Sequence, residues 1–441
     1  MKISNWGKYP VVSAPLIRYE AGRSLNEELK NLNWIPRGMG RCYGDASLGH
    51  AMVSGLGLRR LLAFDELTGI LSCEAGVTFA DLLETFVPRG WFPPVTPGTK
   101  FVSLGGAIAS DVHGKNHHSE GAFSRHVLRF DLLLASGEVV TCSANQHPDL
   151  FHATFGGMGL TGLILRLTLV LKPIGTSQID MESIKARNLE EILDISEQFG
   201  DATYSMAWID CLSRGSSRGR SILMKGEHAT PEQLGAAQRE NPLAIPQKRK
   251  LNVPIDFPAF VLNPLSIKAF NFLYYHKQLA RRVRKLTDYD SFFYPLDAIH
   301  NWNRIYGKRG FVQYQCVFPR AASREGLGEV LDRTARANMG SFLAVLKLFG
   351  PQQGLMSFPM EGYTLALDFP VSNRLFPFLD ALDEVVAGLG GRVYLTKDAR
   401  LKPEMLARMY PNLPRFQDVL REVDPEGRIR SLQSERLGIH G

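Results

Sequence analysis

Two glycine-rich stretches decide the fold: RGMGRCYGD at residues 37–45 and PGTKFVSLGGAIASD at residues 97–111. Closely spaced glycines let successive backbone N–H groups converge on phosphate oxygens without a Cβ in the way. Ser103, which precedes Leu104, is a typical N-cap and could open a short helix towards the same charge. Two such loops suit a pyrophosphate, although each loop alone is also typical of an ordinary turn.

A third glycine string, GMGLTG at residues 157–162, has the G-x-G-x-x-G spacing of a dinucleotide fingerprint. That fingerprint needs a strand before it and a helix after it. Here the context is reversed, because residues 149–155 look helical and residues 163–171 alternate like a strand. We therefore expect no Rossmann site at this string.

The rest of the chain divides by pattern into three parts. Up to about residue 172, β-rich runs alternate with Gly/Pro turns, and the apolar spacing of residues 79–87 predicts a helix. The composition changes from residue 176 to 391, and the last part begins with a strand ending in charge at 392–400, followed by an amphipathic helix at 403–409. Strands are expected at residues 69–75, 127–135, 139–142, 163–171, 205–211, 311–318, 342–349 and 363–369. This pattern indicates an α+β fold.

Length and composition exclude several classes of protein. The 441 residues are too many for one ordinary core and predict about two or three domains. Shares of 44% hydrophobic and 22% charged residues exclude collagen, coiled coil and disorder. The 51 Lys and Arg exceed the 44 Asp and Glu by 7, without concentrated basic blocks, so we expect no nucleic-acid partner.

The cysteines and the N-terminal residues indicate the cellular compartment of the protein. The five cysteines are widely separated and form no C-x-x-C pair, which predicts neither a disulfide framework nor a cysteine zinc site. The first ten residues lack the apolar core of a secretory signal, and no apolar run is long enough to span a bilayer. These features predict a cytoplasmic protein.

The string HGKNHH at residues 113–118, with His126 further on, allows three interpretations. Three imidazoles within six residues could bind a metal. However, the adjacent His117 and His118 point in different directions and no H-E-x-x-H motif accompanies them, so we expect no metal. The histidines are otherwise hydrogen-bonded in a tight loop, or they face a cofactor or substrate.

Residues 270–286 are aromatic first and basic afterwards, with Lys277, Arg281, Arg282, Arg284 and Lys285. An amphipathic segment of this kind can rest on an anionic membrane surface, because its aromatics enter the interface while its cations meet phosphates. The alternative is a solvated helix face.

Taken in order, these motifs resemble those of one family. The chain contains R-G-x-G-R-x-Y-G-D, then P-G-T and G-G-A-I-A-x-D-x-H-G-K-N-H-H, then G-G-x-G-L-T-G. This order closely resembles the FAD-dependent oxidoreductases of the vanillyl-alcohol-oxidase superfamily, with a PCMH-type FAD-binding domain, and within it the branch that oxidises polyprenyl-phosphoryl ribose. The similarity continues through SMAWID at 205–210, YPLD at 294–297, WNRIYG at 302–307, QYQ at 313–315, the stretch 342–350 and TKD at 396–398.

The resemblance implies an architecture. The FAD-binding domain would be built from residues 1–175 and 392–441, and a substrate-binding cap domain would lie between them at 176–391. The cap would contain an antiparallel sheet with flanking helices.

The resemblance also implies which residues bind the cofactor and the substrate. FAD would be held by Gly38, Met39, Gly40, Arg41, Cys42, Tyr43, Pro97, Gly98, Thr99, Ser103, Gly105, Gly106, Ala107, Ala109, Ser110, His113, Gly114, Asn116, His118, Gly159, Ile164 and Lys397. The substrate would be bound by Trp208, Gln313, Gln315, Lys347, Thr364 and Ala366. Strand alternation places Gln313 and Gln315 on one face, and buried structural glutamines are the alternative.

Lys397 is the residue that we expect to be most coupled to the chemistry. Its ammonium could stabilise negative charge on the reduced flavin and orient the sugar hydroxyl, whereas a role as base would require a pKa lowered from about 10.4 by burial. From the sequence alone, Lys397 and Asp398 are equally consistent with an exposed pair at a strand end. Tyr43 and His113 are alternative proton-handling groups, His113 because imidazole titrates near neutrality.

Two departures from relatives affect the chemistry. Many superfamily members tether FAD through a histidine after the first glycine loop, but this chain has Arg41 and Cys42 there, which predicts non-covalent FAD. Mycobacterial-type relatives carry a cysteine where this chain has Ala366, so inactivation by thiol-directed reagents at that place is not expected. Thr364 stands where relatives have a polar amide, which leaves the sugar that is recognised open.

The implied function is FAD-dependent oxidation of the 2-hydroxyl of a polyprenyl-phosphoryl-β-D-ribose to the 2-keto sugar. This would be the first half of epimerisation to the arabinose form for cell-envelope glycan synthesis, and a separate NAD(P)H-dependent reductase would complete it. The protein would lie at the inner face of the plasma membrane. The alternatives are a soluble sugar-alcohol or aldonolactone oxidase of the same superfamily, and a membrane-associated or nucleic-acid-binding protein that is not an enzyme.

Overall fold

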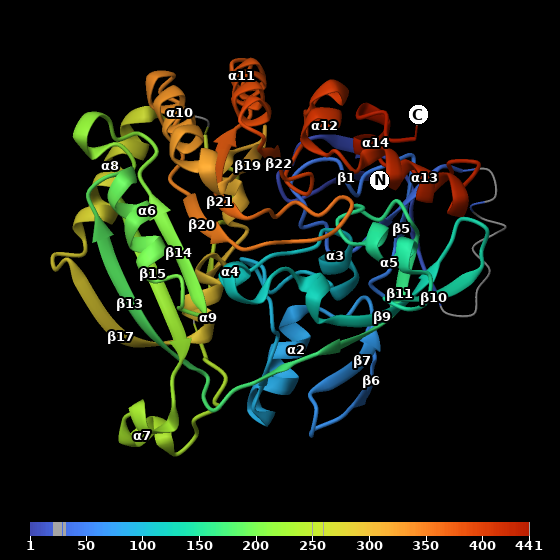
Figure 1. Ribbon diagram of the computed structural model, residues 1–441, viewed down its shortest axis with the longest axis horizontal. Helices are drawn as coiled ribbons and strands as arrows, with labels where there is room; N and C mark the ends of the chain where they lie inside the picture. The colour runs from blue at the N-terminus through green and yellow to red at the C-terminus, as the bar shows by residue number, and fades with distance from the viewer. Residues whose placement is uncertain (21–28, 30–31, 249, 259, 441) are drawn as a thin grey trace.

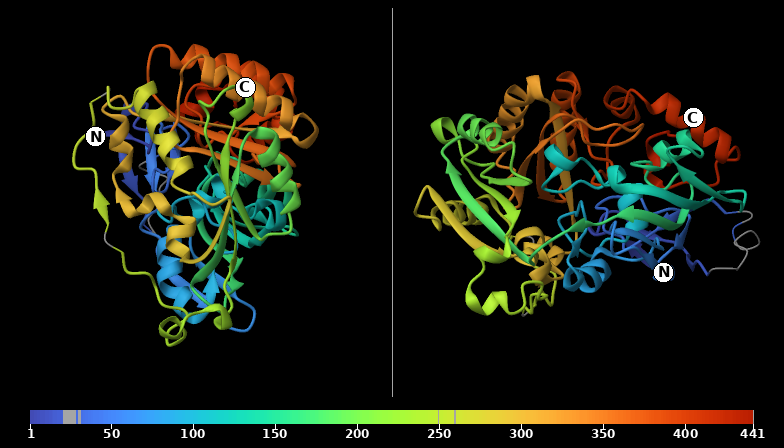
Figure 2. Two further views of the ribbon diagram at one scale, coloured as in Figure 1. Left: turned by 90° about the vertical axis from the view of Figure 1, so that its left-hand side faces the viewer. Right: turned by 60° about the horizontal axis from the view of Figure 1, so that its bottom comes forward.

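The computed structural model describes residues 1–20, 29, 32–248, 250–258 and 260–440. Two assemblies lie side by side (Figures 1 and 2). One contains most of the N-terminal part together with the C-terminal helices, and the other is built around a large sheet from the middle of the chain.

Two sheets form the core of the first assembly. A three-stranded parallel sheet has the order β3-β5-β4, and a five-stranded antiparallel sheet has the order β10-β9-β11-β7-β6. The strands are β3 (Leu16–Arg18), β4 (Trp34–Arg37), β5 (Ala51–Ser54), β6 (Leu61–Phe64), β7 (Ile70–Glu74), β9 (Val127–Leu133), β10 (Val139–Ser143) and β11 (Leu163–Val170). The strands predicted up to residue 172 are confirmed as β7, β9, β10 and β11.

Helix α2 (Phe79–Phe86) confirms the helix that the apolar spacing of residues 79–87 predicts. Thr78 and Asp81 form a capping box at its start, and the apolar residues at helical spacing are all buried. The other helices of this assembly are α3 (Leu104–Ala109), α4 (His117–Glu120), α5 (Pro148–Thr154), α12 (Pro403–Met409), α13 (Leu413–Val423) and α14 (Leu432–Arg436). The last three return to the N-terminal part, where Ile429 forms a parallel bridge with Trp34 (Figure 1).

The second assembly is an eight-stranded antiparallel sheet in the order β17-β13-β15-β14-β20-β21-β19-β22. Its strands are β13 (Gln178–Ala186), β14 (Tyr204–Ile209), β15 (Ser221–His228), β17 (Arg282–Asp288), β19 (Phe311–Pro319), β20 (Ala344–Phe349), β21 (Gly362–Pro370) and β22 (Arg392–Val393). Its helices are α6 (Leu189–Gln198), α7 (Ala236–Arg239), α8 (Pro264–His276), α9 (Tyr289–Phe293), α10 (Ser323–Arg336) and α11 (Leu375–Gly388). The remaining strands form small pairs: β1 (Lys2–Ser4) with β2 (Val11–Ser13), β8 (Trp91–Phe92) with β12 (Lys172–Pro173), and β16 (Leu251–Asn252) with β18 (Ile299–His300).

These sheets and helices confirm the α+β class and correct three details. The strand expected at 392–400 ends after Val393, because the chain turns and the Lys397 amide donates to the Tyr394 carbonyl at 2.9 Å. The strand expected from residue 342 begins at Ala344. Residues 270–286 do not form one amphipathic helix, because α8 ends at His276 and the basic residues continue into β17, which pairs with β13.

The division into 1–175, 176–391 and 392–441 stays a prediction. β22 lies at the last of these boundaries and pairs with β19 in the large sheet, so a residue of the expected C-terminal part belongs to the central sheet. Within the described ranges, no helix has the length and apolarity needed to cross a membrane.

Candidate functional site

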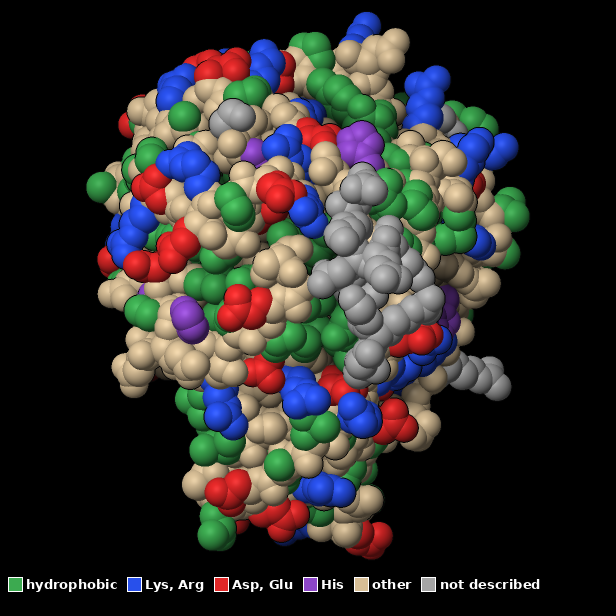
Figure 3. All heavy atoms as spheres, turned by 90° about the vertical axis from the view of Figure 1, so that its right-hand side faces the viewer, with side chains coloured by type: hydrophobic (Ala, Val, Ile, Leu, Met, Phe, Trp, Pro, Cys, Tyr) green, Lys and Arg blue, Asp and Glu red, His purple; other side chains and the backbone are tan. Residues whose placement is uncertain are grey.

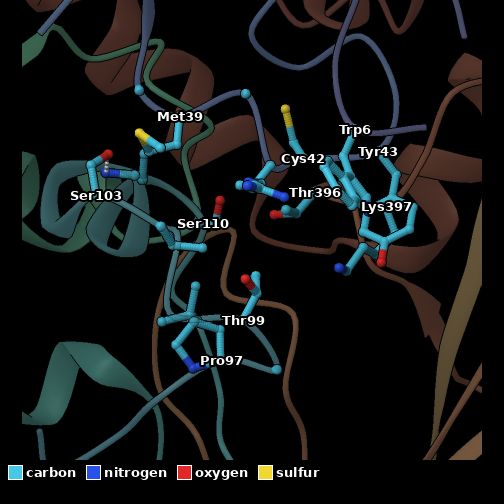
Figure 4. A pocket seen from close by; sticks show the side chains of 18 of the residues that line it. Trp6, Met39, Cys42, Tyr43, Pro97, Thr99, Ser103, Ser110, Thr396 and Lys397 are labelled. Atoms are coloured by element: carbon cyan, nitrogen blue, oxygen red, sulfur yellow. Dashed lines mark hydrogen bonds between the residues drawn. The ribbon is translucent and has the colours of Figure 1, made fainter. Parts of the chain in front are cut away.

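A cavity of about 340 Å³ lies where the two assemblies meet. Both glycine loops and the 113–115 turn line one part of it, and side chains from β19, β20 and β21 line another. Figure 4 shows Met39 and Ser103 in one part of the cavity, with Pro97 and Thr99 below them, and Trp6, Tyr43 and Lys397 in another part. The site is therefore assembled from segments far apart in the sequence.

The two glycine loops lie against each other in the cavity wall. A Cβ on Gly38 would collide with the Ser103 hydroxyl, so glycine lets the loops approach without displacing that side chain. Ser103 in turn accepts from the Gly106 amide and caps α3, as expected from the sequence. A Cβ on Gly98 would meet nothing within 4 Å, which shows that this backbone faces open space in the cavity.

A buried carboxylate, Asp297, fixes the second glycine loop from the other assembly. Its two oxygens accept from the Thr99 hydroxyl at 2.7 Å and from the Lys100 amide at 2.8 Å. Burial raises the pKa of Asp297 above its ordinary value, and these hydrogen bonds act in the opposite direction. Because the residues are about 200 positions apart, this contact ties the loop to the middle of the chain.

The first glycine loop and the turn that carries Lys397 share a C-terminal anchor. Arg436 on α14 donates to both oxygens of Asp45, at 2.9 and 3.0 Å, and to Asp398 at 2.8 Å. Asp398 is 4% exposed and also accepts from the Leu401 amide at 2.8 Å. These bonds hold the end of the first glycine loop and the neighbouring turn after Lys397 in place.

Lys397, Tyr43 and Asp368 form the charged end of the cavity. The Lys397 Nζ lies 3.9 Å from the centroid of the Tyr43 ring. Burial lowers the pKa of Lys397 to about 8, although Asp368 opposes this shift. Burial also raises the pKa of Asp368 to about 7, and raises the pKa of Tyr43 well above 10, so Tyr43 is a neutral phenol at neutral pH.

Asp368 is held by two neutral donors. It accepts from the Gln313 amide at 2.5 Å and from the Tyr306 hydroxyl at 3.3 Å, and it is 1% exposed. Gln313 also lines the cavity, so its side-chain orientation is set by a buried carboxylate.

His113 lies in a cage of aromatic rings formed by Phe349, Phe358 and Tyr394, with centroid distances of 4.8, 5.6 and 5.1 Å. Its Nε2 is 3.0 Å from the Gln315 amide nitrogen, and its Nδ1 is buried without a partner among the described residues. Burial, followed by the nearby Lys347, lowers the pKa of His113 well below 6.5. The imidazole is therefore neutral and can accept a hydrogen bond.

Two further lysines border the cavity. Burial lowers the pKa of Lys347 to about 7, followed by repulsion from Lys397, and no carboxylate pairs with Lys347 in the part of the chain described. Burial likewise lowers the pKa of Lys115 to about 7, followed by repulsion from Lys347. Lys115 donates to the Phe292 carbonyl. An anionic ligand would offset this repulsion, because its negative charge would stabilise the charged form of both lysines.

Most residues predicted for the site line this cavity. They are Gly38, Met39, Gly40, Arg41, Cys42, Tyr43, Pro97, Gly98, Thr99, Ser103, Gly105, Gly106, Ala109, Ser110, His113, Gly114, Gly159, Ile164, Gln313, Gln315, Lys347, Ala366 and Lys397. The structure brings all of them to one place, and their individual roles stay predictions.

Five predicted residues do not line the cavity, because their side chains are used elsewhere. Ala107 is fully buried in α3. Asn116 donates to the Pro94 carbonyl at 2.7 Å, and His118 bonds the Ala202 carbonyl at 2.7 Å. Trp208 donates to the Phe342 carbonyl at 3.2 Å, and Thr364 donates to the Cys316 carbonyl at 2.8 Å. Thr364 still reaches the site indirectly, since it accepts from Gln315 at 3.2 Å.

The histidines singled out as a metal alternative have separate surroundings. His117 is 1% exposed and packs on Phe349 at 4.5 Å, whereas His126 bonds the Glu120 carbonyl at 3.2 Å. Among the described residues, no three His, Cys, Asp or Glu side chains are grouped so as to hold a metal ion.

The residues of the site that the sequence reasoning missed include Trp6, Lys115, Asp297, Asp368 and Tyr394. Asp368 offered a signal, because a carboxylate inside the apolar run 365–369 of an expected strand is unusual and needs partners. Trp6 offered none, since it stacks beneath Arg41 at 4.0 Å through a contact that only the folded chain creates.

Comparison with known proteins adds independent evidence on the family of this chain. Residues 26–143 match the family model described as FAD binding domain. The chain is similar to decaprenylphosphoryl-beta-D-ribose oxidase of Mycolicibacterium smegmatis, with 38% identity over 409 residues that cover 91% of this chain and 88% of that protein. An uncharacterised protein of Streptomyces coelicolor is 35% identical over 82% of this chain and 100% of its own length. Cytokinin dehydrogenase 4 of Arabidopsis thaliana is 31% identical over 22% of this chain and 18% of its own length.

The cavity has the features that FAD requires. Two glycine loops in contact present backbone to open space, as a pyrophosphate needs. A buried imidazole nitrogen without a partner among the described residues, and lysines with lowered pKa values, are available to polar and anionic groups of a ligand.

Proposed function

This chain belongs to the FAD-dependent oxidoreductase family of decaprenylphosphoryl-β-D-ribose oxidase, and from that premise we propose that it oxidises the 2-hydroxyl of a polyprenyl-phosphoryl-β-D-ribose to the 2-keto sugar. The observation that carries the proposal is the meeting of Lys397, Gln313, Gln315 and Lys347 in the same cavity as both glycine loops.

FAD is the cofactor of this family, and we propose that it binds without a covalent bond. The glycine loops with Thr99 and Ser103 would hold its pyrophosphate, and Ile164 would pack on the adenine side. Where tethered relatives have a histidine, Arg41 lies over the Trp6 ring and the Cys42 Sγ is 3.2 Å from the Ser47 hydroxyl. Neither residue is a histidine available for a tether.

Bound FAD would supply the hydride acceptor for the sugar C–H bond. The protein must then bind the sugar and handle the proton of its hydroxyl. Lys397 suits this task best, because a pKa of about 8 leaves its ammonium charged at neutral pH yet close to titration. We propose that the ammonium orients the hydroxyl and stabilises the negative charge that develops nearby.

The two alternative proton-handling groups are less suited to act alone. The raised pKa of Tyr43 keeps its phenol protonated, so it can donate a hydrogen bond but cannot act as base at neutral pH. His113 is neutral, but its Nε2 already meets Gln315. We propose that Tyr43 fixes Lys397 and that His113 fixes Gln315.

Gln313 and Gln315 lie two residues apart on β19 and both line the cavity, so they can bind the sugar hydroxyls. Lys347 on β20 would meet the phosphate, because it lines the cavity and no carboxylate pairs with it among the described residues. Trp208 and Thr364 would act through Phe342 and Gln315, respectively, and Ala366 would border the sugar.

The partners follow from the chemistry of the product. A 2-keto sugar becomes an arabinose only after reduction at the same carbon, and we propose that a separate NAD(P)H-dependent reductase performs this step. A polyprenyl substrate resides in a membrane, so we propose that the protein works at the inner membrane face. We further propose the division into an FAD-binding domain at 1–175 and 392–441 and a cap domain at 176–391.

Anaerobic mixing tests the proposal. Holoprotein mixed with polyprenyl-phosphoryl ribose should lose its flavin absorbance within the mixing experiment, and the sugar should be recovered as the 2-keto form. A simple sugar alcohol and an aldonolactone serve as comparison substrates. Bleaching by either of these, and not by the phosphoryl ribose, would make the soluble oxidase the better assignment. Family membership excludes the alternatives that are not enzymes.

A further inference from the structure

Helix α8 leaves large apolar side chains exposed, unlike an ordinary surface helix. Its buried side contains only Ile267 and the polar Asn271, which is fully buried and donates to Asp210 at 2.8 Å. Its outer side contains Leu265, Phe272 and Leu273, which are 78%, 53% and 67% exposed. Because residues three and four apart share a helix face, these side chains form one stripe. A helix of a water-soluble protein normally buries such a stripe.

Two further exposed apolar residues flank the helix in the sequence. Phe260 before the helix is 76% exposed, and Leu279 after it is 93% exposed. We define the α8 apolar face as Phe260, Leu265, Ala269, Phe272, Leu273 and Leu279. Single exposed apolar residues are normal on proteins, but a continuous set on one element marks an interaction surface.

The charge around this face identifies the kind of partner. Residues 257–287 contain no Asp or Glu and six Lys or Arg, of which Arg281, Arg282 and Arg284 pair with carboxylates of β13 and α6, whereas the three lysines have no carboxylate partner among the described residues. Lys268 and Lys277 are exposed on α8 and its end, and Lys285 is exposed on the edge strand β17. On the side of the molecule away from α8, charges of both signs are interspersed instead (Figure 3). Apolar side chains bordered by cations fit an anionic lipid bilayer, whose phosphates lie just above its acyl chains.

The α8 face also lies next to the substrate end of the cavity. Phe270 on α8 meets the Phe342 ring at 5.6 Å, and Phe342 meets the Tyr306 ring at 5.7 Å. The next residue, Leu343, lines the cavity, as does Trp302. Apolar side chains therefore continue from the helix to the place proposed for the sugar. In Figure 1, α8 is at the end of the molecule opposite α13.

We propose that the α8 apolar face inserts shallowly into an anionic bilayer and that the isoprenoid chain of the substrate passes along Phe270 and Phe342 into the cavity. The second part rests on the proposed function, whereas the first part concerns lipid binding alone. The occupant of the face is thus a lipid surface rather than another protein.

The experiment separates these two parts. Holoprotein is sedimented with vesicles of phosphatidylcholine alone or mixed with phosphatidylglycerol, with no substrate present. We expect binding to the anionic vesicles, and a loss of about tenfold or more in the Phe272→Glu/Leu273→Glu variant, since charges in the interface oppose insertion. Leu67→Glu is the matched control, because Leu67 is 94% exposed on the β6–β7 turn of the other assembly and should leave binding unchanged.

Turnover supplies the second readout. The double variant should oxidise a short-chain, water-soluble prenyl-phosphoryl ribose as fast as the unmodified enzyme, with its flavin absorbance intact, and should lose about tenfold on long-chain substrate in anionic vesicles. Equal vesicle binding by the double variant, or absence of binding by the unmodified protein, would overturn the lipid surface. The lipid surface would also be overturned if the unmodified protein formed a dimer and the double variant did not, since a second copy of the chain would then cover α8. If neither the unmodified enzyme nor the variants oxidised either substrate, the proposed function would be refuted. The result of the vesicle experiment would not be affected.

Discussion

Replacing Lys397 by alanine tests the proposed chemistry most directly. The ammonium lies 3.9 Å from the Tyr43 ring centroid in a buried setting, where a charge acts with little screening by water. Removing one such stabilising group from a water-excluded site costs about 10²–10³ in rate, or about 2.7–4 kcal/mol. We therefore expect Lys397→Ala to reduce flavin about 10²–10³ times more slowly with substrate. FAD should stay bound, since the glycine loops are untouched.

The assay is the anaerobic rate of flavin bleaching, measured with saturating substrate. Lys402→Ala is the matched control, because Lys402 follows on the same segment but its side chain is 53% exposed and pairs with Asp380. A rate within a few-fold of the unmodified enzyme would remove Lys397 from the mechanism. Loss of FAD from the variant would assign Lys397 to cofactor binding instead.

The same residue predicts a pH dependence. Burial lowers the pKa of Lys397 to about 8, so the working ammonium is present below that pH and is lost as the pH rises through it. The bleaching rate should fall about tenfold from pH 7 to pH 9. Lys397→Arg should lack this fall, because a guanidinium stays charged. An unchanged alkaline fall in Lys397→Arg would show that another group titrates.

The remaining predictions concern binding and the cofactor. Lys347→Gln should raise KM for the phosphorylated substrate about tenfold while leaving the limiting bleaching rate nearly unchanged, because a single phosphate contact is lost; an equal KM would place the phosphate elsewhere. Asp297→Ala removes two hydrogen bonds from the second glycine loop and should weaken FAD binding, measured by fluorescence titration, about tenfold; unchanged affinity would show that the loop is fixed without it. Acid precipitation should release all FAD into the supernatant, and yellow colour in the pellet would contradict non-covalent binding. Thiol-directed reagents that act on cavity cysteines should leave turnover intact, whereas Ala366→Cys should become sensitive to them; equal sensitivity of both proteins would point to Cys42.

Local pattern was sufficient for much of the fold. The helix predicted at 79–87 and the one at 403–409 were found as α2 and α12, because both carry apolar residues at helical spacing and a clear start. The glycine loops were also readable, because their closely spaced glycines are a local pattern. These features depend only on neighbouring residues.

Long-range partners could not be read from the sequence. Gln315 and His113 are 202 positions apart, and Asp297 and Thr99 are 198 apart, so no local pattern signals their contact. The charged run after Val393 looked like a strand, but the chain turns there because Asp398 is anchored by Arg436. Similarly, residues 270–286 were interpreted as one amphipathic segment or as a solvated helix face, yet the basic residues after α8 join β17 as an edge strand.

The anchoring of Asp45 and Asp398 by Arg436 has a consequence for biosynthesis. The first glycine loop and the turn after Lys397 depend on an arginine that lies 391 positions after Asp45. A nascent chain can pair its early strands before this arginine exists, so the first glycine loop is anchored only after residue 436 has been synthesised.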